Sequence, residues 1–202
     1  MGDGVRREWF NVVADELLQP DCGLFLSKDG GRTLQPNPHS QLAAGADHLV
    51  HFCLLGRVTG LAVYHKEPLP AHWSSAFIKA VCGFPVTLED VESVDPDLHE
   101  QKIAFIRDGV YASRDGMELA DLDLVFVDED NNEEYSVATT ELKPGGAEIG
   151  VTEANKAEYL QLFAEHRLVG AIRPQVCRPA TPTSPQLSVH SLGSVFAGLS
   201  QL

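Results

Sequence analysis

Four cysteines are the residues of this chain best suited to covalent chemistry: Cys22, Cys53, Cys82 and Cys177. A cysteine attacks as its thiolate, so a nucleophilic cysteine needs a neighbouring group that lowers its pKa. Cys177 has no histidine or acidic residue nearby in the sequence that could activate it. No two cysteines have C-x-x-C spacing, so neither a zinc site nor a disulfide framework is indicated. We therefore expect buried free thiols and assign no catalytic residue.

A second candidate chemistry is calcium binding in the acidic segment near the middle of the chain. Asp128, Asp130 and Asn132 alternate like the start of a calcium loop. Glu133 stands where such a loop needs glycine, and no bidentate glutamate follows at the required offset. We expect these residues to form a solvated hairpin tip.

Polar groups inside apolar segments offer no better site. His48, His51 and Cys53 fall on a predicted helix, but they do not converge on one ion and lack a fourth ligand. Surface or core histidines are the preferred interpretation, and no metal or cofactor is expected. Glu8 and Arg57 are expected to form a structural ion pair or a hydrogen-bonded anchor. Hydrolase, nucleotide-binding and dinucleotide fingerprints do not occur.

Composition limits the class of partner. The 202 residues are 44% hydrophobic, which allows a sizeable core, and the formal net charge is -14. Nucleic-acid binding is not expected, because it requires clustered Lys and Arg. No apolar run approaches the roughly 20 residues that span a bilayer, so no membrane insertion is expected. The default compartment is cytoplasmic, with the nucleus as an alternative.

The first half of the chain should be mainly helical. Apolar spacing predicts a helix over 6–18, a β-hairpin that pairs 22–26 with 33–34, and an extended connector over 35–38. A long helix capped by Asp47 should follow to His65, apolar almost all round and so central to the core. Gly56 and Gly60 should let another backbone approach this helix closely.

The remaining elements follow in regular order. We expect a helix over 73–82, closed by Gly83, a short acidic helix capped by Thr87 with Asp90, and a helix from Pro96 to about Asp108. Strands are predicted over 122–127 and 135–142, with an acidic loop between them, and over 148–151. Thr152 should then cap a helix over 155–168.

These elements make an α+β fold with three parts. Residues 1–115 should form a mainly helical large subdomain, and 116–175 a small hairpin-and-helix subdomain. Residues 176–202 differ in composition and should be a disordered tail. An alternative for the tail is a short docking segment built on four apolar residues: Leu192, Val195, Phe196 and Leu199.

Five motifs in order resemble the N-terminal lobe of HECT-type ubiquitin ligases, and the resemblance extends from Arg7 to Gln175. The branch that includes the Nedd4-like and ankyrin-linked ligases fits best. The motifs are 4–10 (GVRREWF); 23–25 (GLF) with 35–37 (QPN); 48–52 (HLVHF) with 55–65 (LGRVTGLAVYH); 85–90 (PVTLED) with 93–96 (SVDP); and 141–146 (ELKPGG) with 151–159 (VTEANKAEY).

The resemblance implies a function. In HECT-type ligases a ubiquitin-loaded conjugating enzyme (E2) docks on the small subdomain, and a cysteine of the second lobe takes ubiquitin as a thioester before a substrate lysine receives it. It implies E2, ubiquitin and protein substrates as partners. For docking we single out Leu142, Ile149 and Tyr159, although each could equally be a core residue.

The sequence also departs from the family. The family's catalytic cysteine lies in a Thr-Cys-Phe context, whereas Cys177 is followed by Arg178, and no second lobe is recognisable after Gln175. An aromatic pair that binds a second ubiquitin in Nedd4-like members is replaced by Cys22 and by Asn131 or Asn132. We therefore expect a docking fragment that is inactive alone, or alternatively a non-catalytic conjugating-enzyme binder or competitor.

Two further expectations follow from the end of the match. A truncated splice form or a gene-model read-through would explain the change of sequence after Gln175. Loss of the family's next helix should expose apolar surface along residues 159–172, which would leave the small subdomain only marginally stable.

Overall fold

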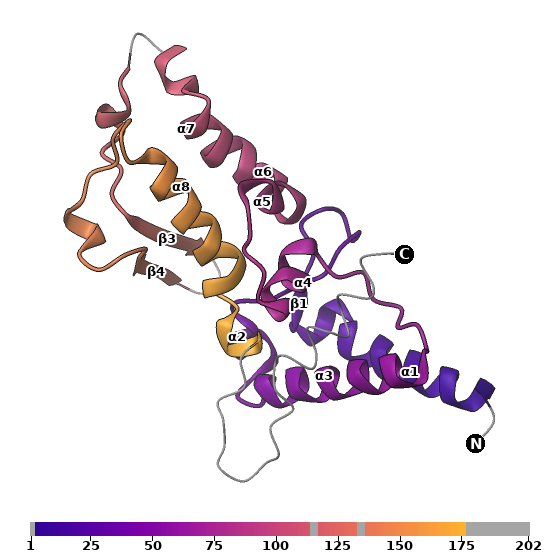
Figure 1. The fold of residues 1–202 in the computed structure, drawn as a ribbon. Coiled ribbons are helices and arrows are strands. Elements are labelled where there is room, and N and C mark those ends of the chain that lie inside the picture. Colours follow the sequence, from indigo (N-terminus) through magenta and orange to yellow (C-terminus); the bar gives the residue numbers. More distant parts are fainter. Residues whose placement is uncertain (1–2, 114–116, 133–135, 177–202) are drawn as a thin grey trace. The chain divides into compact units, whose positions relative to one another are not determined.

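The structure is a computed structural model that describes residues 3–113, 117–132 and 136–176. The chain divides into two compact units, Met1–Pro85 with Ala171–Leu202, and Val86–Gly170. Helices dominate, and the strands form two small antiparallel pairs (Figure 1). The predicted α+β class is therefore confirmed.

Helices build most of the first unit. Phe10 and Ala14 of the first helix are buried, and Phe10 packs with Val58 and Ala62 of the third. A second cluster joins Leu17 to Phe52. The helices of this unit are α1 (Asp3–Leu18), α2 (Ser40–Ala44), α3 (His48–His65), α4 (Ser75–Cys82) and α9 (Arg173–Val176).

The predicted first hairpin is present, but its second strand begins later than expected. β1 (Phe25–Leu26) pairs antiparallel with β2 (Gln35–Pro36), with Phe25 opposite Pro36. Residues 33–34 do not form the strand, because Asp29 holds the connecting loop by accepting hydrogen bonds from the backbone N–H groups of Arg32 and Thr33. Gln35 and Pro36 therefore belong to the sheet and not to a connector.

α3 is half exposed, which contradicts the prediction that it lies in the middle of a core. Its buried face carries Phe52, Leu55 and Val58. A Cβ atom built on Gly56 or Gly60 would meet nothing within 4 Å, so no described backbone lies close to either glycine. The glycine prediction is wrong because both residues lie away from the buried face.

Three polar expectations around α1 and α3 also need correction. Asp47 occupies the N-cap position of α3, but its side chain makes no capping hydrogen bond. Glu8 and Arg57 both have exposed side chains, so neither is a buried anchor. The N-terminal end of α3 is held instead by a buried hydrogen bond between Ser40 Oγ and His48 Nδ1, 2.9 Å apart.

Helix ends in the second unit follow the sequence signals. Thr87 and Asp90 form the predicted capping box, in which the Thr87 N–H donates to Asp90 Oδ2 at 2.8 Å. Asp95 Oδ1 accepts from the Leu98 N–H and so starts the next helix. The helices are α5 (Leu88–Val94), α6 (Pro96–Leu98) and α7 (Phe105–Arg107), and a π-helical turn (His99–Ala104) joins α6 to α7.

The second hairpin begins later than predicted. β3 (Val127–Asn132) pairs antiparallel with β4 (Ser136–Glu141), and Val127 lies opposite Glu141. A 3-10 turn (Leu119–Leu122) precedes it and ends at Asp123, which has a left-handed φ of 48°. A strand over 122–127 is therefore wrong. The predicted acidic tip is also wrong for Asp128, which is a strand residue with 2% exposure.

The last long helix starts one residue later than predicted. α8 (Lys156–Glu165) continues into a π-helical turn (His166–Gly170). Asn155 occupies the N-cap position expected for Thr152. Short 3-10 turns occur at Pro20–Cys22, Val110–Ser113 and Gly146–Glu148, and the predicted strand over 148–151 is reduced to a single bridge between Val125 and Gly150.

The apolar face of α8 is covered, so the expected exposure of this face is wrong. Tyr159, Leu160 and Phe163 are at most 2% exposed, because α5 and α7 pack against α8. This packing also explains why the two compact units do not follow the boundaries 1–115 and 116–175. The functional division at those boundaries stays a prediction.

Two expectations concern residues that the structure does not describe, namely Cys177 and the tail segment. Within the described ranges, no helix is both long enough and apolar enough to cross a bilayer.

Candidate functional site

Phe126 organises the predicted docking region through its backbone. Its N–H faces the carbonyl oxygens of Gly146 at 3.0 Å and Ile149 at 3.2 Å, and its own carbonyl accepts from the Leu142 N–H at 2.9 Å. The Phe126 ring is fully buried. One residue therefore fixes the positions of three chain segments that follow β3.

The three predicted docking residues occupy different environments. Leu142 and Ile149 are half-buried, and both are hydrogen-bonded through the backbone to Phe126. Tyr159 is 1% exposed, and its ring packs edge-on against Phe126 with centroids 5.5 Å apart. Tyr159 is thus a core residue, which is the alternative that the sequence left open. Burial raises the pKa of its hydroxyl to about 12, so it stays neutral.

A glycine makes the close approach at Phe126 possible. A Cβ atom at Gly146 would lie 2.4 Å from the Phe126 carbonyl oxygen, a distance that no side chain tolerates. The preceding Gly145 has a left-handed φ of 72°, which favours glycine. The Gly-Gly pair therefore lets the turn fold back onto the strand and holds Ile149 next to it.

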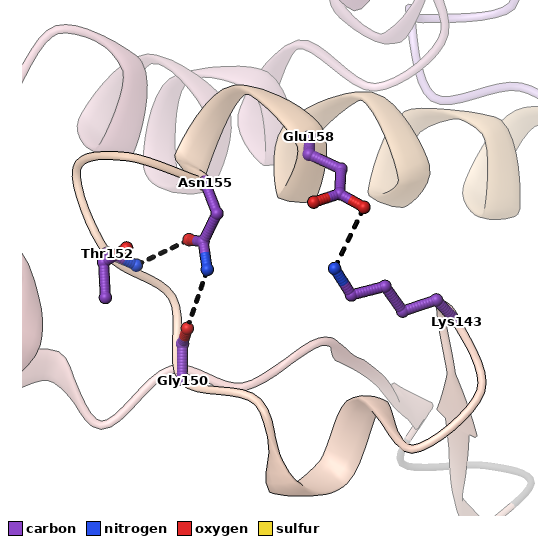
Figure 2. A network of polar contacts seen from close by, with 5 residues as sticks. All are labelled: Lys143, Gly150, Thr152, Asn155 and Glu158. Carbon is purple, nitrogen blue, oxygen red and sulfur yellow. Dashed lines mark hydrogen bonds and ion pairs between the residues drawn. The ribbon is translucent and has the colours of Figure 1, made fainter.

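Lys143 ties this turn to α8. Its Nζ lies 3.7 Å from the centroid of the Phe126 ring. The same Nζ lies 2.9 Å from Glu158 Oε1 (Figure 2). The cation thus contacts the face of a buried ring on one side and a carboxylate on the other. Glu158 is more than half exposed, so the ion pair itself contributes little, while the packed lysine stem helps to fix Leu142.

Asn155 fixes the other end of the turn. Its Oδ1 accepts from the Thr152 N–H at 2.7 Å, and its Nδ2 donates to the Gly150 carbonyl at 3.0 Å (Figure 2). The side chain therefore connects the start of α8 to the segment that carries Ile149. Together with Lys143, it makes a rigid frame around the two half-buried apolar residues.

A buried ion pair supports the hairpin on its other side. Asp128 is 2% exposed, and its Oδ2 lies 2.6 Å from Arg167 Nε while its Oδ1 accepts from Nη2 at 2.8 Å. Nη2 also donates to the Glu129 carbonyl at 2.9 Å. This two-point contact joins β3 to the end of α8. Lys102 packs over the Phe163 ring at 4.1 Å, and burial lowers the pKa of its ammonium group.

The described cysteines are not arranged for nucleophilic attack. Cys22, Cys53 and Cys82 are free, as expected, but they are only half-buried, whereas buried thiols were predicted. Burial raises the pKa of the Cys82 thiol, the opposite of what activation requires. Cys22 Sγ donates a hydrogen bond to the Glu16 carbonyl at 3.0 Å. Among the described residues no group of metal ligands occurs.

Sequence reasoning missed the residues that position the site. In the sequence, Phe126 looked like one more apolar strand residue. Its role is visible only in the fold, where its backbone is hydrogen-bonded to residues on both sides of the Lys-Pro-Gly-Gly turn. Asp128 gave no decisive signal, because a carboxylate directly after an apolar strand run is buried only if a cation faces it. That cation is Arg167, 39 positions away along the chain, which local sequence patterns do not identify.

A family model and two relatives place the chain among known proteins. A family model described as HECT-domain (ubiquitin-transferase) matches residues 11–178. The E3 ubiquitin-protein ligase HACE1 of Xenopus tropicalis is 37% identical over 177 residues, which are 87% of this chain and 18% of that protein. The E3 ubiquitin-protein ligase Smurf1 of Drosophila melanogaster is 39% identical over 173 residues, 85% of this chain and 15% of that protein. The chain thus spans less than a fifth of these relatives.

Proposed function

Because the chain belongs to the HECT-domain (ubiquitin-transferase) family, we propose that it supplies the part of a HECT-type ubiquitin-protein ligase that docks a ubiquitin-conjugating enzyme. The family match over residues 11–178 confirms the resemblance to HECT-type ligases, and it covers most of the chain. Ubiquitin and substrate proteins are partners of the complete ligase under this proposal.

The observation that carries the proposal is the frame around Phe126. It presents Leu142 and Ile149, two half-buried apolar side chains, on backbone held by hydrogen bonds at 2.9 and 3.2 Å. Interfaces depend on a few apolar anchors that are already rigid before binding, because little side-chain entropy is then lost. Tyr159 supports this surface from the core and does not itself contact the partner.

The chemistry proposed for the complete ligase is acyl transfer. A cysteine thiolate attacks the thioester carbonyl between ubiquitin and the conjugating enzyme, and the conjugating enzyme's cysteine leaves as a thiolate. A lysine amine of the substrate then attacks the new thioester and releases the ligase cysteine. The half-buried thiols of Cys22, Cys53 and Cys82 are unsuited to the first step, so the described residues contribute docking.

The same observation favours a second candidate function. A chain that docks conjugating enzymes through Leu142 and Ile149, with no activated thiol among its described residues, would compete with complete ligases for them. In that case it is a non-catalytic binding protein. The two functions share the docking surface and differ in whether ubiquitin is transferred to the chain.

A binding titration beside a discharge assay tests both. The purified chain is mixed with a panel of ubiquitin-loaded conjugating enzymes, and the products are run on non-reducing gels. Binding without a reducible ubiquitin adduct supports a docking part without its own acceptor cysteine. An adduct on the chain would instead identify an acceptor thiol outside the described residues. Absence of binding across the panel would refute the docking proposal.

Substitutions locate the surface. Leu142→Ala and Ile149→Ala should each weaken binding roughly tenfold, because loss of an interface anchor typically costs more than 1 kcal/mol. Leu42→Ala is the matched control, since Leu42 is a leucine of the other unit with 62% exposure. Circular dichroism melts of all three variants separate lost binding from lost folding. Equal binding by all three would place the docking surface elsewhere.

A further inference from the structure

One face of α3 carries an apolar stripe that the described residues leave uncovered. Its members are spaced i, i+4, i+11 and i+14, which places them along one line of the helix. Their exposed fractions are 64% for Val50, 43% for Leu54, 47% for Leu61 and 79% for Tyr64. The opposite face of α3 is the one that packs into the core. We call these four residues the α3 stripe.

A stripe of this kind marks a binding surface. Isolated exposed apolar residues are common, but four of them along one face of an 18-residue helix, with only Arg57 between them, are not, because such a face loses favourable burial. Gly56 and Gly60 lie beside it with open space at their Cβ positions, so a second helix could approach closely there.

The chain itself contains a segment with the matching pattern. Leu192, Val195, Phe196 and Leu199 follow the spacing i, i+3, i+4 and i+7. Residues 187–202 contain no Lys, Arg, Asp or Glu. Such a segment brings no charged side chain of its own into an apolar contact.

The described chain ends next to α3. Helix α9 contacts α3, and Gln175 Nε2 donates to Ser40 Oγ at 3.1 Å. Ser40 Oγ in turn is 2.9 Å from the ring of His48, the first residue of α3. Leu192 follows Val176 by 16 positions. Sixteen residues span about 20 Å as a random coil and roughly 50 Å as an extended Pro-rich chain, against roughly 27 Å for the whole of α3, so the connection is long enough.

We propose that residues 187–202 dock on the α3 stripe of the same chain, with Leu192, Val195, Phe196 and Leu199 facing it. Attachment to the same chain gives the segment a local concentration in the millimolar range, so even a small stripe is occupied. The inference does not depend on the proposed ligase function. Under this proposal, residues 187–202 cover an apolar surface of the first unit in the same chain.

A second copy of the chain is the weaker alternative occupant. Stable interfaces use about 20–30 residues on each side, far more than four side chains provide. Arg57 also lies on the line of the stripe, near the middle of α3. In a two-fold α3 pair the two Arg57 side chains would face each other, and like charges in that position oppose association. The uncharged tail meets no such repulsion.

Site-specific photo-crosslinking tests the proposal on the full chain. p-Benzoylphenylalanine replaces Tyr64 in the stripe, and in a matched control it replaces Phe84, an aromatic residue of the same unit with 58% exposure. Irradiated chains are digested and cross-linked peptides are identified by mass spectrometry. Mixing isotopically light and heavy chains distinguishes bonds within one chain from bonds between two.

The expected result is a cross-link within one chain from position 64 to residues 187–202, well above the yield from position 84. Phe196→Lys should lower that yield roughly tenfold, because an ammonium group would then be buried in the apolar contact and would face Arg57. Ser194→Lys should leave it unchanged, since position 194 lies on the opposite side of the helical pattern. Cross-links between light and heavy chains, or none above the control, would overturn the proposal.

Discussion

At the scale of single residues, Asp128 matters more than its place in an acidic segment suggested. Its carboxylate is almost fully buried and meets Arg167 at two points, 2.6 and 2.8 Å away. A buried charge that loses its partner is costly, because nothing else replaces the lost solvation. The pair therefore fixes one geometry between β3 and the end of α8.

Replacing this carboxylate should destabilise the second unit. Asp128→Ala leaves the Arg167 guanidinium without its ion-pair partner, and we expect a loss of about 3 kcal/mol in the free energy of unfolding. Chemical denaturation followed by circular dichroism measures it. Glu129→Ala is the control, because Arg167 contacts the backbone carbonyl of Glu129, which the substitution keeps. A loss below 1 kcal/mol for Asp128→Ala would mean that Arg167 finds other partners.

At the scale of elements, the loop between β1 and β2 depends on one carboxylate. Asp29 accepts hydrogen bonds from the backbone N–H groups of Thr33 and Arg32 and from the hydroxyls of Thr33 and Ser27. These bonds, with that from the Thr33 backbone as the largest cause, lower the pKa of Asp29 from 3.8 to about 2. The ionised form is therefore the one that the folded loop favours.

The lowered pKa gives a signed pH prediction. Stability from the Asp29 carboxylate is fully present above pH 3.8 and is lost as the pH falls towards 2, because the unfolded chain takes up the proton first. Asp29→Asn should therefore melt below the parent chain at pH 6, and the difference should shrink between pH 4 and pH 2. Asp15→Asn on α1 serves as control. A difference in melting temperature that is constant with pH would contradict this account.

The element scale also shows what the sequence could predict. Local signals succeeded where a helix end is decided within a few residues, as in the Thr87–Asp90 capping box and the stop at Gly83. They failed where a distant residue decides. Asp128 was expected at a loop tip because Arg167 was invisible to local reasoning. The docking region in the second unit stays a prediction. Tyr159, a core residue, shows why the sequence could not define it: apolar residues of core and surface look alike in a sequence.

At the scale of the whole molecule, the chain has two compact units, each with its own buried residues. The division has a physical basis in the packing of α5 and α7 on α8 within one unit and of α1 on α3 within the other. Separate cores allow separate unfolding, unless the surface between them is large and apolar. The tryptophans offer a way to observe this, since both Trp9 and Trp73 belong to the first unit.

We therefore expect two unfolding transitions that one substitution can separate. Tryptophan fluorescence should report the first unit alone, whereas circular dichroism at 222 nm should report the helices of both. Asp128→Ala should lower the midpoint of part of the dichroism signal and leave the fluorescence midpoint in place, because Asp128 and Arg167 both lie in the second unit. Phe10→Ala, a core change in the first unit, should do the reverse. If either variant shifts both signals equally, the units unfold as one cooperative body, and the frame around Phe126 then depends on the integrity of α1 and α3.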